Sequence, residues 1–241
     1  ANFQNQIFGL KNFDYIGNSY SDLESWKISN KAITFNAGKS LKRKCELINP
    51  NSLHLKNNNH TSFLNTFLKE IRPIQWIKNI LVFIPMIAAQ AFGIQYVWGS
   101  FMAFLSFCLT ASSLYILNDL LDINADRHHP KKCKRPFASG ELSFRNGAIG
   151  GLFLLILGLS FGLTVGIFFL KILLIYSFIT ISYSLFLKRK ELIDIFILSG
   201  LYTIRIIAGS FATNLETSPW LFAFSIFIFL SLASVKRQAE L

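Results

Sequence analysis

The sequence has 241 residues, of which 52% are hydrophobic and 15% are charged, and its formal net charge is +11. A basic balance can indicate nucleic-acid binding, but here the Lys and Arg residues gather at the ends of long apolar runs, as in helices anchored at an anionic membrane surface. The three cysteines (Cys45, Cys108 and Cys133) are far apart and odd in number. They predict neither a disulfide framework nor a metal cluster. These features argue against a nucleic-acid-binding protein and against a disulfide-stabilised domain.

The first 71 residues are polar, whereas residues 72–241 are mostly apolar and rich in Phe, Leu and Ile. The polar part alternates strand-like and helix-like patterns, expected at 13–16 (strand), 23–29 (helix), 32–36 (strand) and 40–47 (basic helix). Residues 1–48 therefore predict a small α/β unit, too short to enclose a core of its own. The Asn-, Ser- and Lys-rich stretch 49–66 is expected to be a linker, in which His54 and His60 are solvated.

One short stretch of this unit, YIGNSYSDL at 15–23, resembles the last motif of haloacid-dehalogenase-type phosphatases. In that family a Gly-Asp-x-x-x-Asp pattern after a strand helps to hold Mg²⁺. Gly17 and Asp22 fit the pattern, while Asn18 stands in place of the first carboxylate. The alternative interpretation is an ordinary turn of Gly, Asn and Ser. The resemblance implies the end of a phosphatase-like domain without its nucleophilic Asp, which is expected upstream, so this unit is not expected to be a working phosphatase.

Six apolar segments follow, and each approaches the roughly 20 residues needed to cross the hydrocarbon core of a bilayer. They are expected at 74–92, 97–117, 148–166, 172–187, 192–213 and 219–235. Lys78 and Pro85 interrupt the first of them. We therefore predict an all-α polytopic membrane domain over residues 67–241, preceded by the small partial α/β segment.

The charges of the connecting segments predict how this domain is oriented. Basic residues cluster after the second, fourth and sixth apolar segments, while the opposite connections hold only Lys171 and Glu216. Cationic loops stay on the cytoplasmic side. The basic clusters, the amino-terminal unit and the acidic stretch described next are therefore all expected to face the cytoplasm.

The stretch 118–136 follows directly on an apolar segment and carries three aspartates. On a continuing helix, spacings of three and four place Asp119, Asp122 and Asp126 on one face. Three like charges on one face repel one another, and a divalent cation would reverse that cost. A solvated helix end with ion pairs to Arg127 and its neighbours is the plainer alternative, but ionisable groups at such depth are usually functional. The sequence thus predicts a Mg²⁺ site.

Basic side chains complement these acids, because Lys and Arg can bind the phosphate oxygens that a carboxylate-held Mg²⁺ leaves free. Arg205 is the most specific candidate, since it lies inside the fifth apolar segment, eleven residues after Asp194. That spacing is roughly 16 Å along a helix, about half the hydrocarbon core. An Arg at that depth is expected to face a polar cavity or a carboxylate. The candidate phosphate ligands are Lys78, Lys131, Arg135, Lys188, Arg205 and Lys236.

Several separated motifs together resemble one known family. The stretch Asn118-Asp119-x-x-Asp122-x-x-x-Asp126, with Arg135-Pro136 downstream, resembles the first aspartate-rich motif of UbiA-type intramembrane prenyltransferases. RPIQWIKN at 72–79, YSLFLK at 183–188 and RIIAG at 205–209 are similar to one branch of that family, the decaprenyl-phosphate phosphoribosyltransferases. The resemblance covers residues 67–241. It implies a UbiA-like helical bundle, with about six of nine helices present, and a cytoplasmic Mg²⁺-pyrophosphate site in a bacterial inner membrane.

What the resemblance implies for the activity is transfer of 5-phosphoribose from phosphoribosyl pyrophosphate to a polyprenyl phosphate, in the synthesis of cell-envelope polysaccharide precursors. Asp119 and Asp122 would bind Mg²⁺ on the pyrophosphate, and Asp126 would extend the site. The implied catalytic residues are Asp119, Asp122, Asp126 and Asp194. The implied substrate-binding residues are Lys78, Asn118, Lys131, Arg135, Tyr183, Lys188, Arg205 and Lys236. The second motif carries the single aspartate Asp194 where aromatic prenyltransferases carry a cluster, which favours the phosphoribosyl branch.

Two other functions stay open on the sequence. The same acids could serve a prenyl transfer in which prenyl pyrophosphate is the donor and an aromatic ring is the acceptor. A transporter would need charges distributed through the bilayer depth, whereas nearly all charges here lie at one face, with Arg205 as the exception. The acceptor chain length and the oligomeric state are not predicted.

Overall fold

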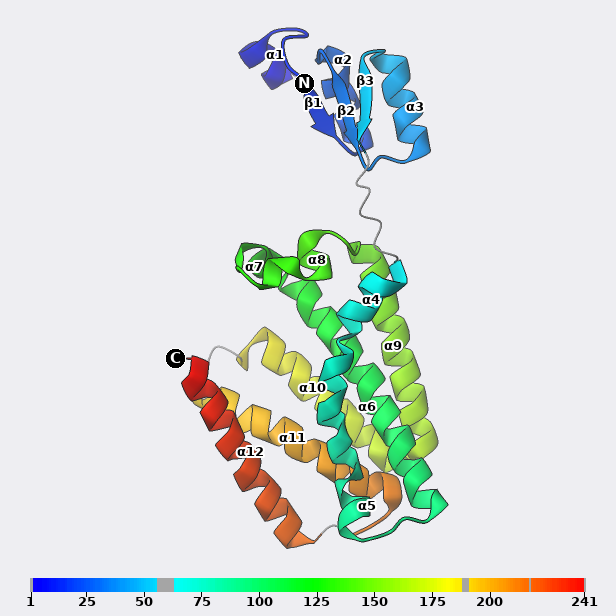
Figure 1. Ribbon diagram of the computed structural model, residues 1–241, viewed down its shortest axis with the longest axis vertical. Helices are drawn as coiled ribbons and strands as arrows, with labels where there is room; N and C mark the ends of the chain where they lie inside the picture. The colour runs from blue at the N-terminus through cyan, green and yellow to red at the C-terminus, as the bar shows by residue number, and fades with distance from the viewer. Residues whose placement is uncertain (1, 56–62, 188–190, 217, 241) are drawn as a thin grey trace. The chain divides into compact units, whose positions relative to one another are not determined.

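The structure is a computed structural model that describes residues 2–55, 63–187, 191–216 and 218–240. It divides into two compact units, Ala1–Thr61 and Ser62–Leu241 (Figure 1).

The amino-terminal unit is a three-stranded parallel sheet with strand order β1-β2-β3. Its elements are α1 (Asn2–Phe8), β1 (Tyr15–Gly17), η1 (Tyr20–Asp22), α2 (Leu23–Ile28), β2 (Ala32–Phe35), α3 (Lys39–Ile48) and β3 (Ser52–Leu55). A small core of Trp26, Ala32, Leu41 and Cys45 joins the sheet to α2 and α3. The α/β segment predicted from the sequence is therefore present.

The linker was predicted to begin at residue 49, but Ser52–Leu55 form the strand β3 of the sheet. Ser52–Leu55 pairs in parallel with Ala32–Phe35. His54 is not simply solvated, because its Nδ1 lies 2.7 Å from Thr34 Oγ1 and its Nε2 lies 2.8 Å from Glu46 Oε1. The strand was missed because its short polar-apolar alternation lies inside an Asn-rich stretch. His60 lies outside the described residues.

The turn after β1 is closed by the side chain of Asp22. Its Oδ2 accepts hydrogen bonds from the backbone N–H groups of Asn18 (2.8 Å) and Ser19 (2.9 Å), and Tyr15 donates to Oδ1 over 3.3 Å. Partial burial by itself raises the pKa of Asp22, but these hydrogen bonds to the charged form outweigh it and lower the pKa below its usual value. The contacts support the turn interpretation, and the phosphatase resemblance stays a prediction.

Helices are the regular secondary structure of the described residues of the second unit. Its elements are α4 (Phe63–Ile71), η2 (Pro73–Phe83), α5 (Ile84–Ala88), α6 (Ile94–Leu121), α7 (Ile123–His128), η3 (Lys132–Lys134), α8 (Pro136–Ser139), α9 (Phe144–Val165), α10 (Ile167–Leu185), α11 (Glu191–Thr213) and α12 (Pro219–Glu240). Five helices are long and apolar enough to cross a membrane, and a bent pair formed by Phe63–Ile71 and Pro73–Ala88 would make a sixth span. The prediction of an all-α polytopic membrane domain is confirmed.

The bend between α4 and η2 is held in place by the central helix α6. Arg72 separates the two elements in a left-handed backbone conformation (φ 55°, ψ 61°), which is uncommon for a residue other than glycine. Pro73 contributes, since a proline disfavours the α conformation of the residue before it. Ser112 of α6 accepts a hydrogen bond from Trp76 Nε1 (3.0 Å) and donates one to the Ile71 carbonyl (2.9 Å). These contacts fix the direction in which the Arg72 side chain leaves the bend.

Helix α6 is the centre of the unit and packs against α9, α10, α11 and η2 (Figure 1). Phe107 is fully buried there, between the rings of Phe169 (5.8 Å) and Tyr176 (5.1 Å). Against α9 the approach is close, because Gly158 accepts a hydrogen bond from Ser106 Oγ at 2.7 Å. Small residues at such contacts are typical of membrane helices, where backbone proximity replaces the hydrophobic effect.

We expect Gly209→Ala to destabilise the unit, because a Cβ atom at Gly209 would lie 2.1 Å from the Val82 carbonyl oxygen. Either α11 or η2 would have to shift. Overpacking of this kind costs about 1–3 kcal/mol and should lower Tm by roughly 3–10 °C. Thermal unfolding in detergent measures the effect. Gly200→Ala is the matched control on the same helix, since a Cβ there meets nothing within 4 Å. Equal Tm values for the two variants would contradict the close contact.

Candidate functional site

The predicted aspartates do not lie on one continuous helix. Helix α6 ends at Leu121 and α7 begins at Ile123, with Asp122 at the break (φ −94°, ψ 7°). Asp119 and Asp126 are 2% and 3% exposed, whereas Asp122 is only half-buried. The expectation of a single acidic face was therefore wrong, because the chain changes direction in the middle of the motif.

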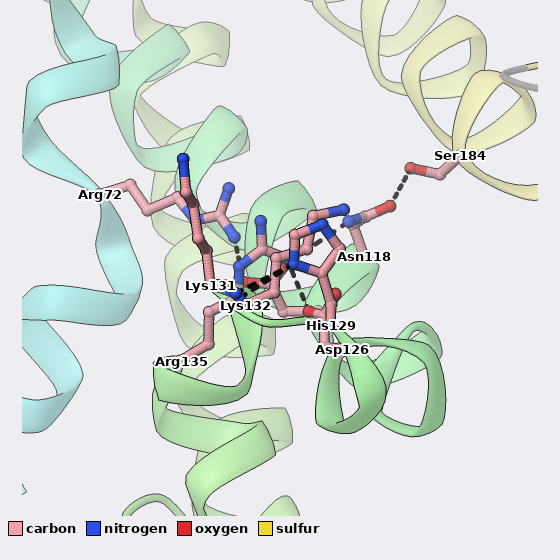
Figure 2. A network of polar contacts seen from close by, with 9 residues as sticks. Arg72, Asn118, Asp126, His129, Lys131, Lys132, Arg135 and Ser184 are labelled. Atoms are coloured by element: carbon pink, nitrogen blue, oxygen red, sulfur yellow. Dashed lines mark hydrogen bonds and ion pairs between the residues drawn. The ribbon is translucent and has the colours of Figure 1, made fainter.

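Two arginines join the separated acids into one cluster (Figure 2). Arg135 lies 3.0 Å from Asp119 Oδ1 and 2.6 Å from Asp126 Oδ2 through the same guanidinium nitrogen. Arg72, from the bend between α4 and η2, forms an ion pair with Asp119 Oδ2. Asp119 is thus held by a guanidinium on each carboxylate oxygen, and such charge-assisted contacts are among the strongest hydrogen bonds in proteins.

A further carboxyl group, that of Glu70, reaches the cluster from α4. Glu70 is 1% exposed, and its carboxyl group lies next to that of Asp119. Its Oε1 atom is buried and has no hydrogen-bond partner among the described residues. Sequence reasoning missed Glu70 and did not assign Arg72 to the site. A signal existed only for Arg72, which stands next to Pro73 at the start of the first apolar segment.

The cluster contains suitable donors for a divalent cation but is not a preformed metal site. Within the described ranges, no group of three or more His, Cys, Asp or Glu side chains is placed to hold a metal ion. However, Asp119 and Asp126 both face the Arg135 guanidinium, so a cation already bridges two buried carboxylates there. Oxygen donors of this kind are those that Mg²⁺ prefers.

Next to the cluster lies a cavity of about 230 Å³, walled by η2, α6, α10, α11 and α12. Its lining is polar and cationic for a membrane protein. Four basic side chains line it, Arg72, Lys78, Arg205 and Lys236, together with the four tyrosines Tyr115, Tyr176, Tyr183 and Tyr202. Asn118 lines it as well and connects the cavity to the adjacent Asp119.

Arg205 is anchored in the wall of this cavity by neutral groups. The side chain is 4% exposed and donates to Asn79 Oδ1 (2.9 Å), to Tyr176 OH (3.0 Å) and to the Leu201 carbonyl. Its guanidinium also lies 4.9 Å from the ring centre of Tyr176. The expectation that Arg205 faces a polar cavity is confirmed. In the described part of the chain no carboxylate pairs with it, so none of its partners there neutralises its positive charge.

The other predicted residues divide into four groups. Lys78, Asn118, Tyr183 and Lys236 line the cavity. Asp194 is buried but does not line it, and instead accepts a hydrogen bond of 2.5 Å from Tyr183 OH. Lys131 is exposed, and its backbone N–H lies 3.2 Å from His129 Nδ1. Lys188 lies outside the described residues.

Sequence reasoning also missed the tyrosines Tyr115, Tyr176 and Tyr202. A signal for two of them was present, because Tyr115 precedes Asn118 by three positions and Tyr202 precedes Arg205 by three. Residues three apart lie on the same helix face. Tyrosines at that spacing from a predicted site residue could therefore have been assigned to the site.

Comparison with known proteins identifies the family. Residues 79–237 match the UbiA prenyltransferase family. The chain is 34% identical over 236 residues to the uncharacterised protein y4nM of Sinorhizobium fredii, covering 95% of this chain and 44% of that protein. It is 36% identical over 187 residues to the decaprenyl-phosphate phosphoribosyltransferase of Mycolicibacterium smegmatis, covering 75% of this chain and 58% of that protein. The chain thus spans about half of the length of these curated relatives.

The fold has close counterparts among solved structures. A UbiA homologue from Archaeoglobus fulgidus, solved with GPP and Mg²⁺, superposes with a TM-score of 0.59 at 21% identity, over 69% of this chain and 60% of that one. At that identity the likeness concerns the fold, and the sequence match carries the assignment. The chain belongs to the UbiA prenyltransferase family.

Proposed function

We propose that the whole protein transfers 5-phosphoribose from phosphoribosyl pyrophosphate to a polyprenyl phosphate and releases pyrophosphate. Within the family, the similarity to proteins named decaprenyl-phosphate phosphoribosyltransferase supports this donor and this acceptor. The clustering of basic loops on one side of the helices supports a site that faces the cytoplasm, in a bacterial inner membrane.

The observation that carries the proposal is the chemistry of the cavity beside the aspartates. Lys78, Arg205 and Lys236 line it together with tyrosine hydroxyls. A phosphorylated sugar offers anionic oxygens and hydroxyl groups to such a wall. A prenyl chain offers neither, and would leave these charged and polar groups desolvated without partners. The lining therefore favours phosphoribosyl pyrophosphate over prenyl pyrophosphate as the donor.

Asp119 and Asp126, with Asp122 at the helix break, would hold a Mg²⁺ ion. Bound there, the ion would neutralise the negative charge that develops on the leaving pyrophosphate. Arg72 and Arg135 already lie against these carboxylates and would bind phosphate oxygens.

The proposed reaction needs no general base from the protein. A polyprenyl phosphate is an anion at neutral pH and is nucleophilic without a general base. Catalysis is then mainly positioning of two anionic substrates and stabilisation of the charge that leaves with pyrophosphate. Tyr183 and Arg205, on neighbouring walls of the cavity, would orient the ribose and the phosphate groups.

The test is product analysis with the whole protein in detergent or proteoliposomes. Incubation with phosphoribosyl pyrophosphate, a polyprenyl phosphate and Mg²⁺ should give a phosphoribosyl lipid, detected by mass spectrometry, and one pyrophosphate for each product molecule. A parallel reaction offers prenyl pyrophosphate and an aromatic acceptor. A product only in the parallel reaction would overturn the proposed donor, and uptake into vesicles without any change in the lipid would point to transport.

A further inference from the structure

The last turn of α10 connects two neighbouring helices through two consecutive residues. Tyr183 donates a hydrogen bond of 2.5 Å to Asp194 Oδ1 on α11. Ser184 donates one of 2.6 Å to Asn118 Oδ1 on α6 (Figure 2). Successive residues of an α-helix point about 100° apart, which allows adjacent side chains to reach different helices. The turn thereby contacts Asp194 directly and Asn118, the neighbour of Asp119.

The contact of Ser184 continues to the carboxylate of Asp119. Because Asn118 Oδ1 accepts from Ser184, the amide nitrogen of Asn118 is the end that faces Asp119, and it lies 3.4 Å from Oδ1. The same Asp119 oxygen accepts from Arg135 at 3.0 Å. Without the Ser184 hydroxyl, the amide could turn and bring its own oxygen towards the carboxylate, where the two acceptors would repel each other.

We propose that Ser184 is a positioning residue of the donor site. Through its hydrogen bond to Asn118 it orients the Asp119 carboxylate, and it thereby strengthens the binding of pyrophosphate. The inference rests on the proposed function in one respect, namely that Asp119 belongs to the pyrophosphate site. It adds a residue of α10 to that site and assigns it a role that does not require contact with the ligand.

A double-mutant cycle measures this role directly. The variants are Ser184→Ala, Asn118→Ala and the combination of both, and the quantity measured is the Kd of inorganic pyrophosphate with Mg²⁺, by calorimetry on the whole protein in detergent. Ser184→Ala should weaken binding about three- to fivefold, as expected for one lost neutral hydrogen bond that acts indirectly. In the Asn118→Ala background the same substitution should have no further effect, since the link to Asp119 is already absent.

Two further variants separate positioning from a purely structural role. Ser184→Thr keeps the hydroxyl and should restore binding. Ser182→Ala, two residues earlier on α10, is the matched control, because Ser182 makes no side-chain hydrogen bond within the described residues, and it should bind pyrophosphate as the unmodified protein does. A lower Tm for Ser184→Ala with an unchanged Kd would overturn the positioning role.

The remaining outcomes distinguish this inference from the proposed function. Additive effects of the Ser184 and Asn118 substitutions would mean that Ser184 acts on the ligand independently of Asn118, and would overturn the inference. If Asp119→Asn weakens pyrophosphate binding but Ser184→Ala does not, only the link through Ser184 fails. If Asp119→Asn leaves pyrophosphate binding unchanged, the donor site itself is misassigned.

Discussion

Asp119→Asn is expected to lower the kcat of the proposed phosphoribosyl transfer by about 10²–10³-fold or more, the range found when one preorganised contact to a transition state is removed. Asp119 is the central carboxylate of the cluster, because Arg72, Arg135 and Glu70 all lie against it. An amide of the same shape keeps the packing but can neither balance two guanidinium groups nor bind a divalent cation well. Turnover is measured as release of pyrophosphate from phosphoribosyl pyrophosphate in the presence of the lipid acceptor.

The control for this prediction is Glu141→Gln, which neutralises an exposed carboxylate in the connection between α8 and α9. It should leave kcat unchanged. Because loss of one partner from a buried ion pair can cost about 3–5 kcal/mol of stability, the assay is run well below the Tm of each variant. Asp122→Asn supplies a second test, since Asp122 is half-buried and its neutralisation endangers folding less. Full activity in both aspartate variants would refute the assignment of the aspartates.

The helices of the membrane domain could be predicted because each apolar segment is long and bounded by charged or turn-forming residues. Five of the six predicted segments correspond to helices that can span a membrane. The first differs, because it is interrupted and its helical part joins α4 through the bend at Arg72. That bend depends on Ser112 of α6, a tertiary partner that local sequence patterns do not reveal.

For the site too, local sequence patterns predicted part of the arrangement, and contacts between distant segments determined the rest. The motif at 118–126 contains both aspartates that pair with Arg72 and Arg135, but the single helical face assumed for the motif fails because α6 ends just before Asp122. The partners of Asp119 come from other parts of the chain, Arg72 from the bend and Arg135 from the loop after α7. Glu70 had no sequence signal at all, because a carboxyl in a short amphipathic helix usually lies in solvent. Burial of such a group is decided by packing against α6.

Substitutions of Arg205 are expected to change the KM for phosphoribosyl pyrophosphate. Comparing Met with Lys at this position separates the effect of the charge from that of the guanidinium geometry. Arg205→Met should raise the KM for phosphoribosyl pyrophosphate by about 10–100-fold, because contacts with a charged partner contribute roughly 1.5–3 kcal/mol. Arg205→Lys keeps the charge, but a lysine cannot contact Asn79, Tyr176 and the Leu201 carbonyl together as the guanidinium does. We expect an intermediate KM for this variant. The measurement is the KM of each substrate, with the other held saturating.

The KM values of the two proposed substrates show which of them Arg205 binds. If Arg205 binds a phosphate of the donor, the KM for phosphoribosyl pyrophosphate should rise while that for polyprenyl phosphate stays nearly constant. Arg145→Met, which removes an exposed arginine of α9, should change neither value. A rise confined to the polyprenyl phosphate would place the acceptor in the cavity instead. Unchanged values for both substrates would mean that the buried charge serves stability alone, although a buried arginine that pairs with no described carboxylate costs free energy to maintain. That cost is why a ligand role is the stronger expectation.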